Sequence, residues 1–245
     1  MQVVLLCGGR GTRIRGEVAD APKPLLPIGG RPIVSHLMDR YAAYGMRDFV
    51  LLTGHRAEDF ERAFAPGSPH HPAGARVTLL PTGEDAQTGT RLRRFAPDLQ
   101  GDCCMMSYGD CLADVDLRAL LDFHAGHGRA ATLTAVRPAS RWGELVLDGG
   151  RVTAFKEKPK DGQPPVNGGF MVLDRRVFEL LDELDAGADR ADLVFEQEPL
   201  ARLAADGELM AFEHDGFWQP MDTYREWQVL EELWSTGHPP WVRGA

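Results

Sequence analysis

The chain has 245 residues, a hydrophobic fraction of 43% and a formal net charge of −9 at pH 7. This hydrophobic fraction is ordinary for a globular domain with a buried core, and the negative charge argues against nonspecific binding to nucleic acid or to an anionic membrane. No apolar run approaches the roughly 20 residues of a membrane span. No signal peptide precedes the first predicted strand, so we expect a cytoplasmic protein without a membrane partner.

The cysteines show neither the paired spacing of a zinc site nor a disulfide framework. We expect them to be small buried hydrophobic residues in a reducing compartment. They are Cys7, Cys103, Cys104 and Cys111.

Strand and helix patterns alternate through the first half of the chain. Continuous apolar runs predict buried strands at 3–7, 48–53, 76–80, 103–107 and 131–136. Helical spacing of apolar residues predicts helices at 32–44, 57–64 and 117–127. This alternation indicates an α/β fold, a single Rossmann-like domain with a mixed, mostly parallel central sheet flanked by helices.

The pattern changes beyond Pro138. Segments 144–147 and 151–155 flank Asp148-Gly149-Gly150, which predicts a β hairpin. Further strands are expected at 169–173 and 209–213, and helices at 175–184, 193–205 and 223–234. Because no flexible linker and no internal repeat divides the chain, we expect one domain over 1–245 whose second half forms a lid over the first.

A glycine-rich turn follows the first predicted strand. Glycines here let the backbone approach a ligand closely and point amide N–H groups into one cavity, which suits an anion. Lys23 stands between Pro22 and Pro24, and these prolines stiffen the backbone that carries the ammonium group. An ordinary turn with surface basic residues is the alternative, but it leaves the clamped lysine unexplained. The stretch predicts a nucleoside triphosphate site.

Two common phosphate-binding motifs are absent from this turn. A Rossmann fingerprint needs a third glycine where Ile14 stands, and the Gly-Lys-Ser/Thr of a Walker loop does not occur. The pattern GGRGTR followed by PKPLLPIGGRPI instead resembles the signature of the sugar-1-phosphate nucleotidylyltransferases. The resemblance implies that Arg13 and Lys23 are catalytic residues that bind and neutralise the triphosphate.

A carboxylate follows the fourth predicted strand at Asp110. Ligands of open α/β sheets bind at the carboxyl ends of the strands, and a carboxylate there can hold Mg²⁺ against phosphate oxygens. The alternative is that Asp110 caps the next helix, but Asp114 or Asp116 lies closer to that helix. Asp114 and Asp116 also form the DxD triplet of many glycosyltransferases, for which capping is the favoured interpretation.

Asp222 precedes the last predicted helix, so from the residues alone a helix cap and a metal ligand are about equally supported. The family resemblance implies that Asp222 is the second Mg²⁺ ligand, beside Asp110. In the implied reaction a sugar phosphate oxygen attacks the α-phosphorus of the triphosphate, and pyrophosphate leaves. Positioning and charge neutralisation then carry catalysis without a protein nucleophile.

The second half resembles the sugar-binding half of the same family. In the family's EKP motif, the counterpart of Glu157 binds sugar hydroxyls and that of Lys158 binds the sugar phosphate; a solvated charge run is the alternative. By the same resemblance, Asn167, Tyr108 and the Gly143 amide face the sugar phosphate. Residues 1–137 would mainly bind the nucleotide, and residues 138–245 would mainly bind the sugar.

Three segments resemble the glucose-1-phosphate cytidylyltransferases in particular: PTGEDAQTGTRLRR, FEQEPLARLAADGELMAFEHDGFWQPMDT and the closing W–PPW. The implied substrates are CTP and glucose 1-phosphate, with CDP-glucose as the product. Arg91 is expected to bind either the cytosine carbonyl or the phosphates. The implied nucleotide contacts are Leu6, Cys7, Gly8, Gly9, Gly11, Thr12, Arg13, Lys23, Thr82, Thr88, Gly89, Arg91 and Gly109.

Several alternatives stay open. UTP, dTTP or another sugar 1-phosphate could replace the expected substrates, and a DxD glycosyltransferase or a non-catalytic nucleotide-sugar-binding regulator would share the fold. The segment between Phe64 and Thr82 is shorter than in typical cytidylyltransferases. The sequence therefore decides neither which base is preferred nor whether the protein forms a homo-oligomer.

Overall fold

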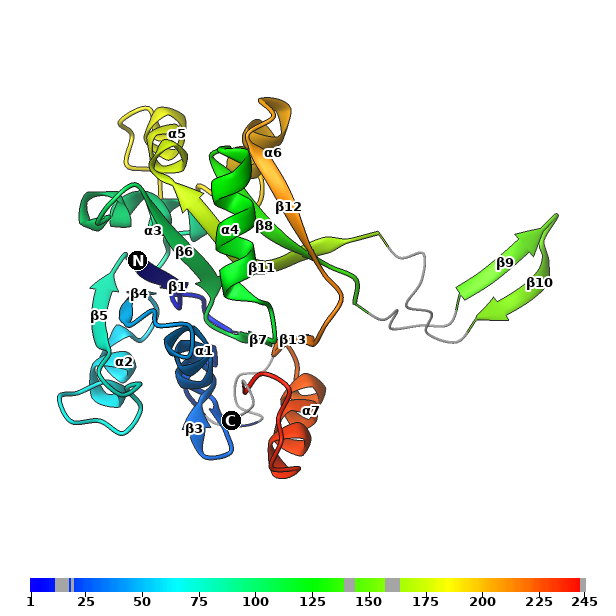
Figure 1. The fold of residues 1–245 in the computed structure, drawn as a ribbon, viewed down its shortest axis with the longest axis horizontal. Coiled ribbons are helices and arrows are strands. Elements are labelled where there is room, and N and C mark those ends of the chain that lie inside the picture. Colours follow the sequence, from blue (N-terminus) through cyan, green and yellow to red (C-terminus); the bar gives the residue numbers. More distant parts are fainter. Residues whose placement is uncertain (12–17, 19, 139–143, 157–163, 243–245) are drawn as a thin grey trace.

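The computed structural model describes residues 1–11, 18, 20–138, 144–156 and 164–242. Its central sheet has the strand order β12–β8–β11–β6–β1–β4–β5 (Figure 1). The strand β11 runs antiparallel to both of its neighbours, and the other pairs are parallel, so the sheet is mixed and mostly parallel as predicted. The bounds are β1 Gln2–Leu6, β4 Asp48–Thr53, β5 Arg76–Pro81, β6 Cys103–Tyr108, β8 Ala131–Val136, β11 Val166–Asp174 and β12 Leu209–His214.

Helices cover both faces of this sheet. One hydrophobic core lies between the sheet and α1, α2, α4 and α7, and a second lies between the sheet and α3, α5 and α6. Successive side chains of β1 alternate between the two cores, because strand side chains point to opposite faces. The bounds are α1 Ile33–Ala42, α2 Ala57–Ala63, α3 Thr88–Phe95, α4 Leu117–His127, α5 Arg175–Asp185, α6 Glu198–Ala205 and α7 Tyr224–Ser235.

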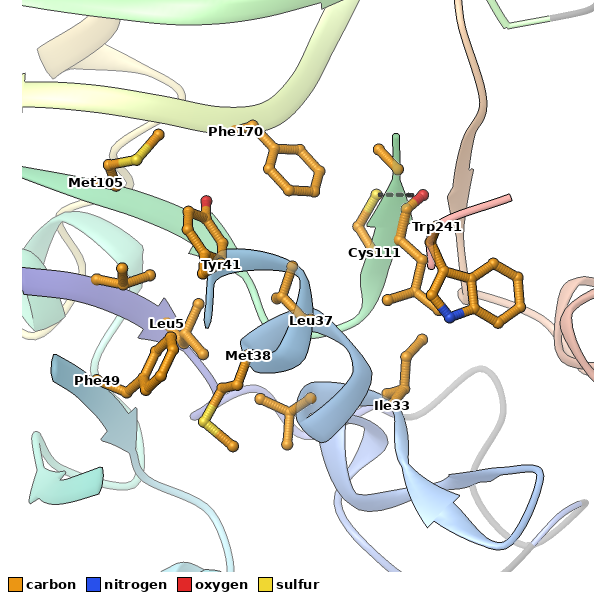
Figure 2. Close-up of a cluster of buried hydrophobic side chains, with 14 of the residues drawn as sticks. Leu5, Ile33, Leu37, Met38, Tyr41, Phe49, Met105, Cys111, Phe170 and Trp241 are labelled. Carbon is orange, nitrogen blue, oxygen red and sulfur yellow. Dashed lines mark hydrogen bonds between the residues drawn. The ribbon is translucent and has the colours of Figure 1, made fainter. Parts of the chain in front are cut away.

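The first core forms around α1. Leu37, Met38 and Tyr41 belong to this cluster (Figure 2). The Tyr41 hydroxyl lies 2.6 Å from Ser107 Oγ. Trp241, near the end of the chain, is buried in the same cluster with 1% of its surface exposed. The C-terminal segment is thereby fixed against the helix that follows the Lys23 loop.

The structure corrects one helix prediction and adds a helix that was not predicted. The helix expected at 193–205 begins only at Glu198, with Pro199 in its first turn, where a missing N–H costs nothing. No element was predicted for the segment 88–95, which forms α3 because Leu92 and Phe95 are buried in the second core, despite the weak helix propensity of Thr and Gly.

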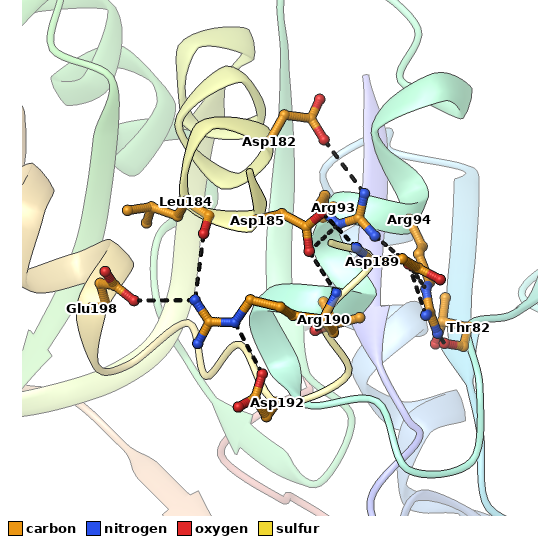
Figure 3. Close-up of polar contacts among 11 residues, drawn as sticks. Thr82, Arg93, Arg94, Asp182, Leu184, Asp185, Asp189, Arg190, Asp192 and Glu198 are labelled. Atoms are coloured by element: carbon orange, nitrogen blue, oxygen red, sulfur yellow. Dashed lines mark hydrogen bonds and ion pairs between the residues drawn. The ribbon is translucent and has the colours of Figure 1, made fainter. Parts of the chain in front are cut away.

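Ion pairs fasten α3 to the end of α5 (Figure 3). Arg93 pairs with Asp189 and lies 3.5 Å from Asp185, while Arg94 reaches Asp189 at 2.9 Å. Asp185 is 1% exposed and accepts hydrogen bonds from the backbone amides of Asp189 and Arg190. This network links the first and second halves of the chain.

Within the described ranges, three small two-stranded ladders complete the fold. In two of them β2 (Pro27–Ile28) pairs with β3 (Arg31–Pro32), and β7 (Cys111–Ala113) pairs with β13 (Trp218–Pro220). The third is the predicted hairpin, β9 (Glu144–Asp148) and β10 (Arg151–Lys156), which extends away from the sheet (Figure 1).

The cysteines behave largely as predicted. All of them are free thiols, three are buried, and Cys103 is half-buried. In the part of the chain that the structure describes, no helix combines the length and the apolar character that crossing a bilayer requires.

Candidate active site

A pocket of about 270 Å³ opens at the carboxyl ends of β1 and β6. This is the edge at which open α/β sheets bind ligands. A larger cavity of about 550 Å³ lies beside Met1 and the start of β4, at the opposite edge of the sheet. The smaller pocket is lined by Leu6, Gly9, Gly11, Lys23, Pro24, Ala86, Gln87, Thr88, Arg91, Tyr108, Asp110 and Asp222.

The two predicted metal-ligating aspartates meet through the β7–β13 ladder. Cys111 pairs with Pro220 in this ladder, and the Met221 amide donates a hydrogen bond of 2.9 Å to the Asp110 carbonyl. Asp110 directly precedes β7, and Asp222 closely follows β13, so the pairing of these two strands brings the aspartates together. This pairing explains how carboxylates distant in sequence reach one site.

Lys23 lies between these carboxylates. Its ammonium group forms ion pairs with Asp110 and, at 2.6 Å, with Asp222 Oδ1. Burial alone would lower the pKa of Lys23, but the two carboxylates outweigh burial and raise the pKa above its ordinary value. The lysine is therefore a fixed positive charge in the pocket. Lys23 is the first residue of a short 3-10 helix, and Pro24 is the second.

The helix-cap alternatives for the two aspartates are wrong. Asp116 caps α4, accepting hydrogen bonds from the amides of Arg118 and Ala119 at 3.0 and 3.1 Å. Thr223 caps α7. Asp110 and Asp222 thus present their carboxylates to the pocket rather than to a helix terminus.

This pair of carboxylates fits a hard divalent cation. Oxygen ligands suit such a cation, which commonly binds one or two carboxylates and completes its coordination with phosphate oxygens and water. Among the described residues, no cluster of three or more His, Cys, Asp or Glu side chains could hold a metal by itself.

The side chain of Arg91 is hydrogen-bonded to the glycine turn after β1. This guanidinium group donates hydrogen bonds of 2.9 Å to the carbonyls of Gly8, Thr53 and Gly83, and one of 2.7 Å to Thr82 Oγ1. A Cβ at Gly8 would overlap the guanidinium group. Arg91, only 4% exposed, therefore joins the turns after three parallel strands.

Gly11, in the same turn, has a backbone conformation that favours glycine. Its φ of +57° lies in the left-handed region, which glycine adopts without a steric penalty. Gly9, which lines the pocket, has open space where a side chain would begin. The backbone here can therefore approach a ligand closely.

A hydrogen-bonded chain connects two residues that line the pocket, Tyr108 and Thr88, with Asn167 and Glu196, which do not line it. Asn167 Nδ2 donates to the Tyr108 hydroxyl at 3.3 Å, and this hydroxyl donates to Glu196 Oε1 at 2.5 Å. Glu196 Oε2 accepts from the Thr88 hydroxyl at 2.6 Å. Burial, together with the Glu196 carboxylate, raises the pKa of Tyr108 well above its ordinary range.

No role was predicted for Glu196 from the sequence. It lies in FEQEPL, a segment that resembled the cytidylyltransferases as a whole, and nothing in its spacing set this acid apart from Glu198. Only the fold brings it to Tyr108 and Thr88.

The other predicted residues fall into two groups. Cys7, Gly8, Thr82, Gly89 and Gly109 are described by the structure but are not among the residues that line the pocket. Thr12, Arg13, Gly143, Glu157 and Lys158 lie outside the described residues.

Comparisons with known proteins identify the family of the chain. Residues 2–225 match the nucleotidyl transferase family. The chain is 43% identical to the glucose-1-phosphate cytidylyltransferase of Salmonella typhi, over 98% of both chains. It is 35% identical to a probable glucose-1-phosphate cytidylyltransferase of Bacillus subtilis, over 98% of this chain and 99% of the relative.

Solved structures share the fold at lower identity. A putative glucose-1-phosphate thymidylyltransferase from Bacillus anthracis, in complex with sucrose, superposes with a TM-score of 0.76 at 20% identity, covering 100% of this chain and 97% of that one. HddC from Yersinia pseudotuberculosis, complexed with GMP-PN, gives a TM-score of 0.72 at 21% identity, covering 95% and 99%. By its sequence over nearly its whole length and by its fold, the chain belongs to the nucleotidyl transferase family.

Proposed function

We propose that the protein is a glucose-1-phosphate cytidylyltransferase, which joins CTP and α-D-glucose 1-phosphate to give CDP-glucose and pyrophosphate. The observation that carries the proposal is the meeting of Lys23, Asp110 and Asp222 at one pocket. The 43% identity to the Salmonella typhi enzyme over nearly the whole chain supports the choice of substrates.

The reaction is an in-line displacement at phosphorus. A phosphate oxygen of the sugar phosphate forms a bond to the α-phosphorus of CTP, while the bond between this phosphorus and the bridging oxygen of pyrophosphate breaks. Because all the reacting groups are anionic, the protein must above all orient them and neutralise charge. Lys23 supplies a fixed positive charge, and Arg13 is proposed to supply a second.

Asp110 and Asp222 are the proposed ligands of Mg²⁺. When bound, this cation supplies Lewis-acid neutralisation of the phosphate oxygens. The protein's own contribution is to hold two carboxylates on paired strands, so that both face the phosphates of one triphosphate.

The two substrates are proposed to divide the site. The triphosphate and the ribose would lie against the glycine turn 8–12, and the base near Thr82, Thr88, Gly89 and Arg91. The hydrogen bonds of Arg91 to three backbone carbonyls support a role in shaping this base pocket.

The sugar phosphate would lie toward Tyr108 and Asn167. Glu157, Lys158 and the Gly143 amide are its further proposed contacts. In this arrangement residues 1–137 mainly serve the nucleotide and residues 138–245 the sugar, in a cytoplasmic enzyme.

The glycosyltransferase alternative has little support. Asp116 is engaged as the cap of α4, and the Asp114 carboxylate lies 3.1 Å from His214 Nε2. The triplet therefore does not present two acids to the pocket.

Pyrophosphate release over a matrix of CTP, UTP and dTTP against glucose 1-phosphate and mannose 1-phosphate tests the proposal. We expect the highest kcat/KM for CTP with glucose 1-phosphate. Cytosine and uracil differ by a donor and an acceptor at position 4, and one misplaced hydrogen bond in a dry pocket costs about 1–3 kcal/mol. Equal values for CTP and UTP would refute the cytidylyl preference and leave nucleotidyl transfer intact.

A further inference from the structure

The first turn of α7 begins directly after Asp222 and is closed by a reciprocal cap. The Thr223 hydroxyl accepts from the Glu226 amide at 3.3 Å, and Glu226 Oε2 accepts from the Thr223 amide at 2.9 Å. Such a capping box satisfies amides that the helix leaves without partners.

Glu226 makes a further hydrogen bond that the cap does not need. The same oxygen, Oε2, accepts from the amide of Asp222 at 2.8 Å. Asp222 lies before the cap residue and outside the helix. Its backbone is thus bound by a residue one helical turn further along the chain.

The backbone on the other side of Asp222 is also fixed. Met221 is fully buried, and its amide donates to the Asp110 carbonyl. Asp222 is therefore held between a hydrogen bond to the residue that carries the first carboxylate and a hydrogen bond to Glu226.

We propose that Glu226 is a positioning residue for the cation site: it fixes the backbone of Asp222 so that the Asp222 carboxylate meets Asp110 at one divalent cation. This inference rests on the proposed function. Two carboxylates can share a cation only when both are held to within a fraction of an ångström, and partners outside the coordination sphere commonly set this precision. Glu226 acts through Asp222 and is not a catalytic residue.

The chain offers a matched control at another helix. Asp174 caps α5 by accepting from the Arg176 amide at 2.9 Å. It is paired with Cys103, the first residue of β6, so it lies at the edge of the sheet opposite to the pocket. Loss of this cap should weaken the fold without reaching the cation site.

The test measures Mn²⁺ affinity by electron paramagnetic resonance with CTP present and no sugar phosphate, and the melting temperature beside it. We expect Glu226→Ala to weaken Mn²⁺ binding about 10–100-fold. Glu226→Gln should restore most of the affinity, because its amide oxygen can accept both backbone hydrogen bonds. Asp174→Ala should lower the melting temperature and leave Mn²⁺ affinity as in the wild type.

Wild-type Mn²⁺ affinity in Glu226→Ala with a lowered melting temperature would show that Glu226 only caps the helix. Weakened affinity in Asp174→Ala would also overturn the proposal, since any loss of stability would then have the same effect. If Glu226→Ala does not fold, Glu226→Asp, which keeps the charge on a shorter side chain, is measured in the same way. A wild-type protein that releases no pyrophosphate from CTP and glucose 1-phosphate would refute the proposed function instead.

Discussion

Among the residues of the pocket, Lys23 carries the charge whose role is most directly testable. Its ammonium group is bound by two carboxylates, and its side chain is 16% exposed. A surface lysine would instead be free to take many positions at little cost. The fixed charge fits stabilisation of a phosphoryl transfer better than general attraction of anions.

We expect Lys23→Ala to lower kcat by about 10²–10³-fold with a smaller change in the KM for CTP, as for the loss of one well-placed donor to a transition state. Steady-state kinetics over both substrates measures this. Arg202→Ala is the control, because Arg202 is an exposed cation of α6 that pairs with Asp206 and does not line the pocket. An unchanged kcat with a raised KM would show that Lys23 only attracts the nucleotide.

We expect Asp222→Asn to remove at least about 3 kcal/mol of transition-state stabilisation, a loss of about a hundredfold or more in kcat. The melting temperature should change little, because Thr223 and not Asp222 caps α7. Calorimetry and pyrophosphate release on one preparation separate the two effects. Near-normal turnover with a lower melting temperature would assign Asp222 a structural role.

At the scale of helices and strands, α4 contains a pair of histidines that should make stability depend on pH. Thr132 Oγ1 lies 2.8 Å from His124 Nδ1 and 2.7 Å from His127 Nε2. Burial lowers the pKa of both imidazoles, and the nearby carboxylates of Asp174 and Glu208 offset burial only in part. The folded state therefore favours neutral rings.

We expect the free energy of unfolding to fall as the pH decreases below about 6.5, where the histidines of the unfolded chain bind protons that the folded chain binds less readily. Above this pH both states hold neutral rings, and the pair causes no pH dependence. Urea unfolding between pH 5 and 8 measures the slope. His127→Gln should reduce it, and an equal slope in this variant would contradict the assignment.

Several elements could be predicted from the sequence because their patterns are local. The apolar run of β4 is found at its predicted bounds, 48–53, and Asp110 lies just past β6 as expected. The β7–β13 ladder could not be predicted, because strands of three residues show no periodicity and their pairing joins distant parts of the chain. The position of Glu196 depends on the fold in the same way.

At the scale of the whole molecule, the two halves of the chain share one sheet. The strand β11, from the second half, lies between β6 and β8 of the first half. The buried Asp185 and the arginines of α3 add polar contacts between the halves (Figure 3). The proposal that one half binds the nucleotide and the other half binds the sugar therefore concerns binding alone. It does not imply that the halves fold separately.

We expect the isolated segment 1–137 not to fold, because removing β11 separates β6 from β8 and exposes the core that Phe170 and Val172 help to fill. Near-ultraviolet circular dichroism and amide-proton dispersion of this segment measure the outcome. A cooperative unfolding transition in segment 1–137 would show that the first half is an independent domain.

The β7–β13 ladder determines at which stage, folding or substrate binding, the conformational entropy of Asp110 and Asp222 is lost. Because the backbones of Asp110 and Asp222 are joined by Met221, orienting these carboxylates costs conformational entropy when the chain folds and not when substrates arrive. With these residues as the proposed cation ligands, ordering of their backbone would not reduce the affinity for a cation–triphosphate complex. Changes that loosen the ladder without touching either acid should consequently appear as a more unfavourable entropy of nucleotide binding.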